Sequence, residues 1–114
     1  MITKYNPTIT GERLKYLRKE VGLTQEDIGR FLGYSTKSTI SQIEKGDIEL
    51  PSQKLFALCK LYGCSSDYLL GLSNQKKFIS PYEKQSIKKK ICKINKKNIE
   101  EKYARWIYYQ NNYQ

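Results

Sequence analysis

A run of polar side chains with few apolar interruptions occupies positions 37 to 45. Its members are hydroxyls, one amide and two ammonium groups: Lys37, Ser38, Thr39, Ser41, Gln42 and Lys45. Amides and hydroxyls form hydrogen bonds with base edges in a nucleic-acid groove, while ammonium groups attract phosphates. Ile40 and Ile43 are the apolar residues of this stretch. It therefore predicts a short helix with a buried apolar edge and an exposed face that fits nucleic acid.

The segment before this run predicts a second short helix that positions the first. Thr24 fits an N-cap, and Asp27 three residues later gives a weaker form of the capping box. Three apolar residues follow at the spacing i, i+3, i+4: Ile28, Phe31 and Leu32. Gly33 then suits a left-handed C-cap. The next helix can begin at one of three hydroxyl residues: Ser35, Thr36 or Ser38.

These two helices and their turn resemble the helix-turn-helix of the lambda-repressor-like (XRE-type) DNA-binding family. The similarity extends over residues 10–71 in three blocks, GERLKYLRKEVGLTQEDIGRFLG, STISQIEKG and PSQKLFALCKLYGCSSDYLLG. It implies an all-α fold in which five helices form a DNA-binding domain. The segment 34–39 is one residue longer than in the tightest phage versions of the motif. The residue that enters the groove first is therefore open by one position.

The resemblance also implies roles for single residues. The residues expected to contact DNA are Gln25, Lys37, Ser38, Thr39, Ser41, Gln42 and Lys45. Among them, Gln25 and Lys45 are expected to hold the phosphate backbone. Gly29 is expected where two helices cross closely, and Arg18 is expected to pair with Glu44 between helices.

Turn residues and changes in composition divide the rest of the chain. Residues 1–9 are interpreted as an N-terminal arm, and Thr10 is expected to cap the first helix of the domain 10–71. Further helices are expected after Pro51 and after Ser65 or Ser66. A polar linker, 72–79, then leads to a basic helical extension, 80–114.

The positive charge of the chain is concentrated in that extension. Residues 1–75 hold ten Lys and Arg against eight Asp and Glu, whereas residues 76–114 hold eleven against three. In one interpretation, the extension adds phosphate contacts or meets an acidic partner. In the other, an AT-rich genome fills exposed positions with lysine, as the seventeen lysines against four arginines suggest.

The extension begins with a complete helix-start signal, since Ser80 fits an N-cap, Pro81 the first position and Glu83 the third. Two apolar sets follow: Ile87, Ile91 and Ile94, and then Ile99, Tyr103, Trp106 and Ile107. On one continuous helix the two sets would lie on different faces, and Asn98 offers a fresh cap. We therefore predict a helical hairpin broken near residues 95–98, with a disordered basic tail as the alternative. The second set is expected to form a homodimer contact.

Several classes of site and protein are not expected. The chain has no histidine, and its three cysteines lack the spacing of a zinc site, so we predict no metal, no cofactor and no enzyme activity. An odd number of cysteines argues against a disulfide framework. The sequence shows no membrane-spanning run and no signal peptide. A soluble, cytoplasmic protein is expected.

The expected function is sequence-specific binding of double-stranded DNA by a transcriptional regulator. We expect a dimeric repressor of a bacterial, prophage or mobile-element promoter, bound to a palindromic operator. Two alternatives stay open. One is an antitoxin that regulates its own operon and binds a toxin through the tail. The other is an antagonist or scaffold that binds another regulator, and a protein antagonist is a further possible partner.

Overall fold

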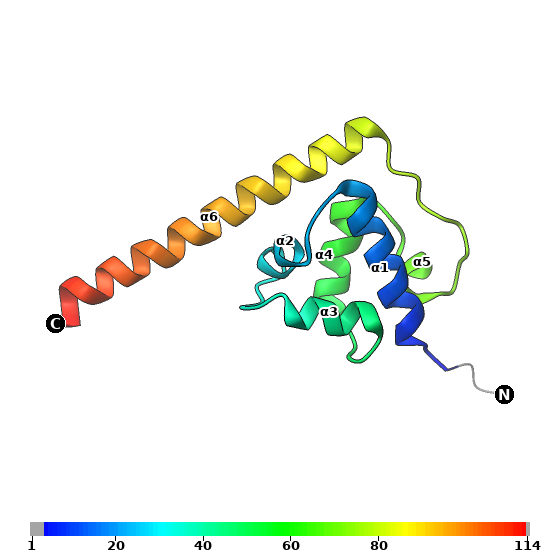
Figure 1. Cartoon of the computed structure of the whole chain (residues 1–114), viewed down its shortest axis with the longest axis horizontal. Coiled ribbons are helices and arrows are strands. Elements are labelled where there is room, and N and C mark those ends of the chain that lie inside the picture. Colours follow the sequence, from blue (N-terminus) through cyan, green and yellow to red (C-terminus); the bar gives the residue numbers. More distant parts are fainter. Residues whose placement is uncertain (1–3, 114) are drawn as a thin grey trace.

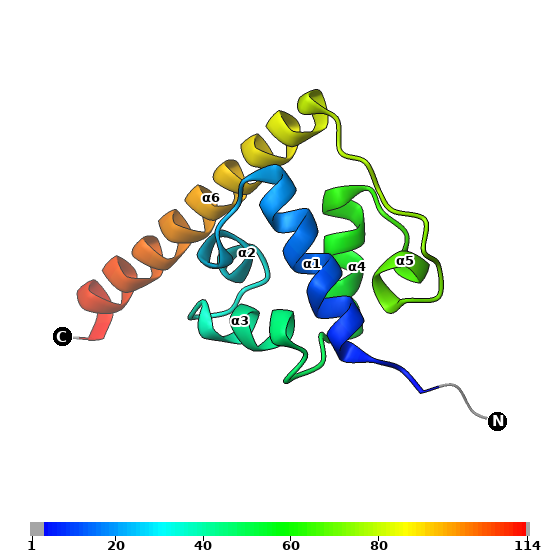
Figure 2. The same cartoon turned by 45° about the vertical axis from the view of Figure 1, so that its right-hand side comes forward.

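The computed structural model describes residues 4–113, apart from the side chains of residues 102, 109, 112 and 113. Its regular elements are helices (Figures 1 and 2): α1 (Pro7–Val21), α2 (Gln25–Phe31), α3 (Ser38–Lys45), α4 (Ser52–Tyr62), α5 (Ser66–Leu70) and α6 (Pro81–Tyr113). The predicted all-α fold class is confirmed. Helices α1 to α5 form one bundle, and α6 lies across α2 and the end of α1 before it projects beyond them.

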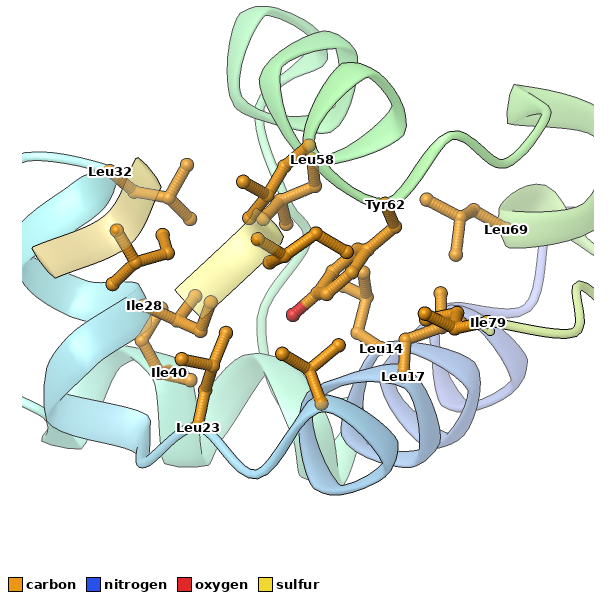
Figure 3. Packing of buried hydrophobic residues seen from close by; sticks show 14 of the residues in the cluster. Leu14, Leu17, Leu23, Ile28, Leu32, Ile40, Leu58, Tyr62, Leu69 and Ile79 are labelled. Atoms are coloured by element: carbon orange, nitrogen blue, oxygen red, sulfur yellow. The ribbon is translucent and has the colours of Figure 1, made fainter. Parts of the chain in front are cut away.

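The core of the bundle lies between α1, α4 and α5. Leu17 and Leu69 are fully buried, and Tyr62 inserts its ring among leucines from these helices (Figure 3). The helix-turn-helix elements close one end of this core with Ile28 from α2 and Ile40 from α3. Burial of aliphatic side chains from all five helices fixes the helices relative to one another, and so holds α3 in place.

The caps predicted for α2, α5 and α6 are present, whereas α3 starts after Lys37 without a side-chain cap. The Thr24 hydroxyl accepts from the Asp27 amide at 3.0 Å, and the Asp27 carboxylate accepts from the Thr24 amide at 2.9 Å. The Ser65 hydroxyl accepts from the amide of Tyr68 at 3.1 Å at the start of α5. Ser80 caps α6 in the same way, by accepting from the Glu83 amide at 3.2 Å. At these three helices, the local spacing of cap residues predicts the helix start correctly.

The predicted arm, 1–9, is wrong from Pro7 onward, and so is the predicted cap at Thr10. Helix α1 begins at Pro7, because the Asn6 side chain accepts from the Thr8 amide at 3.0 Å and proline suits the first helical turn. Thr10 is buried inside the helix, where its hydroxyl donates to the Leu69 carbonyl at 2.7 Å. It joins α1 to α5 rather than capping α1. Residues 1–3 of the predicted arm lie outside the described residues.

The segment between α5 and α6, predicted as a polar linker, is fastened to α1. Arg13 donates to the carbonyl of Ser73 at 2.6 Å and also to that of Tyr68. Lys76 lies over the ring of Tyr16 at 4.0 Å, and Ile79 is buried in the core. The segment therefore carries α6 back to the bundle along a fixed path.

The predicted hairpin in the extension is wrong, because α6 is one helix from Pro81 to Tyr113. Ile87 and Ile91 are buried against the bundle as expected, but Asn95 takes the next buried position and Ile94 is exposed. The Asn95 amide donates to the Asp27 carbonyl of α2 at 3.2 Å. The hairpin was predicted because the two apolar sets lie on different faces of one helix and Asn98 offered a fresh cap. In the structure the helix continues, and the second set stays exposed.

Candidate nucleic-acid interface

Helix α3 presents two different faces. Ile40 and Ile43 are buried in the core, each 3% exposed. The predicted contact residues lie on the other side. Four of them are exposed: Lys37, Ser38, Gln42 and Lys45. Thr39 and Ser41 are half-buried. The structure therefore brings five of the predicted contact residues together on α3, with Lys37 at its N-cap, as a set of hydroxyl, amide and ammonium groups.

A buried ion pair anchors the C-terminal end of α3. Arg18 of α1 donates to both carboxylate oxygens of Glu44, from Nε at 2.7 Å and from Nη2 at 3.0 Å. The remaining Arg18 nitrogen donates to the Leu23 carbonyl at 2.9 Å. The pair that the resemblance implied is thus present, and it joins α1, α3 and the loop before α2. Burial raises the pKa of the neighbouring Tyr62 hydroxyl far above its ordinary value, so this hydroxyl stays protonated.

Gln25, expected to hold a phosphate, joins this buried network. Its Nε2 donates to Glu44 Oε1 at 3.1 Å, and the side chain is half-buried. A glutamine amide has two N–H donors, so one remains for another acceptor. The first residue of α2 is therefore coupled to the last turn of α3 through one carboxylate.

Among the glycines, the tightest approach to another helix lies at Gly11, a position that the sequence reasoning missed. A Cβ at Gly11 would lie 2.4 Å from the carbonyl oxygen of Ile43 in α3, far inside contact distance. At Gly29, where the close crossing was expected, the nearest atom would be the Thr36 oxygen at 3.5 Å, an ordinary contact. A methyl group therefore fits at Gly29 and does not fit at Gly11. The available signal was a glycine inside an otherwise helix-forming segment.

The turn between α2 and α3 is held from both sides. Gly33 has φ +84°, the left-handed conformation expected of it, and the Tyr34 amide donates to the Gly29 carbonyl at 2.8 Å. Lys54 of α4 donates to the Leu32 carbonyl at 2.6 Å and lies over the Tyr34 ring at 4.3 Å. These contacts fix the point from which α3 starts.

The cysteines are free thiols in the structure, as their odd number suggested. Burial and the neighbouring Cys59 raise the pKa of the Cys64 thiol to about 12. Burial also raises the pKa of Cys59. Both therefore stay protonated near neutral pH and contribute small apolar surfaces beside the core. Within the described residues, no group of three His, Cys, Asp or Glu side chains is placed to hold a metal ion.

The predicted dimer residues lie in the second half of α6. Their exposed fractions range from 37% for Ile107 to 63% for Tyr103, with Ile99 at 52% and Trp106 at 58%. The rings of Tyr103 and Trp106 stack at 6.1 Å between centroids. We call these four residues the α6 apolar stripe. The structure gathers them on one helix and leaves them accessible.

A family model described as Helix-turn-helix matches residues 14–69, from α1 to α5. Residues 14–69 belong to this helix-turn-helix family. The lambda-repressor-like resemblance inferred from the sequence is thereby confirmed. This family is one of DNA-binding regulators, not of enzymes. The helix-turn-helix segment contains all seven residues predicted to contact DNA.

Three proteins similar to this chain carry regulator names. The HTH-type transcriptional regulator DicA of Escherichia coli is 39% identical over 74 residues, 65% of this chain. Repressor protein C2 of Salmonella phage P22 is 38% identical over 65 residues, 57% of this chain. The uncharacterized HTH-type transcriptional regulator YobD of Bacillus subtilis is 38% identical over 63 residues, 55% of this chain.

The chain spans 54% of the length of DicA, 55% of YobD and 30% of C2. No solved structure matches it significantly. Across residues 4–113, none of the helices combines the length and the apolar character needed to cross a membrane.

Proposed function

We propose that this chain is a sequence-specific DNA-binding transcriptional regulator that acts as a dimeric repressor of a bacterial, prophage or mobile-element promoter. The carrying observation is the accessible polar face of α3, opposite the buried Ile40 and Ile43 in a matched helix-turn-helix domain. The regulator and repressor names of the similar proteins support the same class. A binding function, rather than catalysis, follows from this proposal.

Helix α3 would enter the major groove, where an α-helix fits and each base pair presents a distinct pattern of donors and acceptors. Gln42 is exposed and suits adenine, with which an amide can form two hydrogen bonds. Lys37 and Lys45, at the two ends of α3, would contact phosphates. Gln25 would donate its remaining N–H to a phosphate of the DNA backbone. Because Gln25 also donates to Glu44 of α3, this phosphate contact would be linked to the position of α3.

The α6 apolar stripe supports the dimer. Trp106 and Tyr103 supply large rigid surfaces, which recur at the centres of interfaces because they lose little entropy on burial. Two copies joined there would read two half-sites of a palindromic operator about 34 Å apart, one turn of DNA. Bound protein would then cover promoter elements and repress transcription.

The test begins with selection of binding sites by the full-length chain from a random pool of duplex DNA. We expect enrichment of an inverted repeat, and protection of such a repeat in the DNA beside the gene. Gln42→Ala should weaken binding by about 1–3 kcal/mol and relax the preference at one base pair. Thr24→Ser is the control, because it changes a residue outside α3 and keeps the hydroxyl that caps α2. Selection that enriches no sequence contradicts the proposal.

The exposed α6 stripe also favours a second candidate, in which it binds another protein: a toxin in an antitoxin system, or another regulator. Such a partner would cover the same apolar side chains. The two candidates differ in the oligomeric state of the purified chain. A dimer that dissociates on dilution supports the repressor. A chain that stays monomeric and binds a neighbouring gene's product supports the second candidate.

A further inference from the structure

A cavity of about 290 Å³ opens between the C-terminal end of α2 and the middle of α6. Two of the chain's four arginines line it, Arg30 from α2 and Arg105 from α6. Asn98 and Tyr34 add an amide and a phenol, and Glu101 adds a carboxylate. Guanidinium groups form paired hydrogen bonds with phosphate oxygens, so the two arginines suit a phosphate group.

The face of α6 that carries Arg105 is the face that docks on the bundle. Arg105 follows Ile87 by eighteen residues, about five full turns, so both lie on the same side. Along this face Ile87 and Ile91 are buried, Asn95 is a buried amide, Asn98 is half-buried and Arg105 is exposed. The docking face thus changes from apolar to amide to cationic where α6 projects past the bundle (Figures 1 and 2).

The cavity borders the start of α3. A neighbouring hollow shares Arg30 and Tyr34 with it and is also lined by the residues just before α3: Ser35, Thr36 and Lys37. Arg30 therefore lies beside the end of α3 that begins with exposed Lys37 and Ser38, and Arg105 lines the adjoining cavity with it. A DNA strand at the edge of a groove filled by α3 would run from Lys37 toward this cavity.

We propose that Arg30 and Arg105 together hold a phosphate of the DNA backbone beside the groove that α3 enters. This inference rests on the proposed function and gives the extension a part in it. Arg30 is already paired with Glu26 at 2.6 Å, but that pair is exposed and within one helix, so it exchanges readily for a phosphate. A free phosphate compound has the same chemistry. Continuity with the residues before α3 favours DNA.

The experiment uses the full chain and the duplex selected by it. Arg105→Ala should weaken binding about tenfold, as expected for a lost charge-assisted hydrogen bond. The plot of log affinity against log salt should become shallower by about 0.9, one phosphate contact, with base preferences unchanged. Lys89→Ala is the matched control, because it removes one exposed charge about 160° around α6 from Arg105. It should leave the salt dependence unchanged.

Two further variants separate the phosphate contact from an effect on dimerisation. Arg30→Ala changes a residue of α2 rather than of α6, the helix that carries the apolar stripe, and should make the salt dependence shallower by the same amount as Arg105→Ala. Glu101→Gln should tighten binding, because it removes a negative charge beside the phosphate. Sedimentation of each variant at the assay concentration should show the same oligomer as the wild type.

The outcomes distinguish this inference from the function on which it rests. If the wild-type chain binds its duplex and both arginine variants keep its salt dependence, the phosphate contact is wrong and the function stands. Inorganic phosphate that saturates the free wild-type protein, with unchanged duplex binding by Arg105→Ala, assigns the cavity to a free phosphate and also overturns the proposal. Failure of the wild type to select any duplex overturns the function itself.

Discussion

The two halves of α6 belong to one helix but differ in what covers their apolar side chains. In the first half, Ile87 and Ile91 are buried against the bundle, 4% and 2% exposed. In the second half, Tyr103 and Trp106 are more than half exposed. A helix gains most of its stability from packing of an apolar face, so the first half is stabilised within the chain. The second half has its apolar face available for a partner.

The largest expected change in folding stability comes from the buried ion pair between Arg18 and Glu44. Glu44→Ala should lower the free energy of unfolding by about 3–5 kcal/mol, because it leaves the Arg18 guanidinium buried without its partner. The matched control is Glu26→Ala, which breaks the exposed pair with Arg30 and should change stability by less than about 0.5 kcal/mol. Urea denaturation of the two variants tests this. Equal losses of stability in Glu44→Ala and Glu26→Ala would contradict the burial of the Arg18–Glu44 pair.

The next effect comes from the crossing of α1 and α3. Gly11→Ala should destabilise the protein by about 2–3 kcal/mol, because the added methyl meets the Ile43 carbonyl and the backbones must separate. Gly29→Ala should instead be neutral or stabilising by up to about 1 kcal/mol, since alanine favours a helix and the methyl fits. Thermal unfolding of both variants compares them directly. A neutral Gly11→Ala would show that the two helices are not in close contact there.

A smaller change, in this case a gain in stability, is expected from a substitution at Asn95, where α6 packs against α2. Asn95 is 5% exposed, and its Oδ1 has no hydrogen-bond partner among the described residues. An unsatisfied buried acceptor is unfavourable, so Asn95→Leu should stabilise the docked state by about 1–2 kcal/mol. Ile94→Leu, at the exposed neighbouring position, is the control. Hydrogen exchange of the α6 amides would report slower opening in the first variant alone.

Comparison of these residues shows which features can be predicted from sequence. The caps at Thr24, Ser65 and Ser80 involve residues three positions apart, so local spacing is enough to find them. Gly11 could not be assigned, because its importance depends on the Ile43 carbonyl of another helix. The same holds for the buried Asn95, whose partner is a carbonyl of α2.

The predicted DNA contacts are a mixed case. The pattern of Ile40 and Ile43 fixes which face of α3 is exposed, so the residues of that face follow from sequence. Arg30 and Arg105 lie 75 positions apart in the sequence and line one cavity only because α6 continues past α2 as one helix. A predicted break near residues 95–98 removed that possibility from the sequence argument.

The smallest effect on folding, and the sharpest test of the comparison, concerns Trp106. It is 58% exposed in a single chain, so Trp106→Ala should change the unfolding free energy of the monomer by less than about 0.5 kcal/mol. If the α6 stripe forms the dimer, the same change should weaken dimerisation by about 2 kcal/mol or more, since tryptophans at interface centres dominate binding energy. Ile91→Ala, on the docked half, should show the reverse pattern: a loss of folding stability of about 2–5 kcal/mol and little direct effect on the α6 contact.

Trp106 is the chain's single tryptophan, so its fluorescence reports this site alone. Emission should be blue-shifted at high concentration and move toward that of free tryptophan on dilution, with the same midpoint as the dimer in sedimentation. Emission like that of free tryptophan at concentrations where the chain sediments as a dimer would place the dimer contact elsewhere, and would remove the main support for the role proposed for the second half of α6.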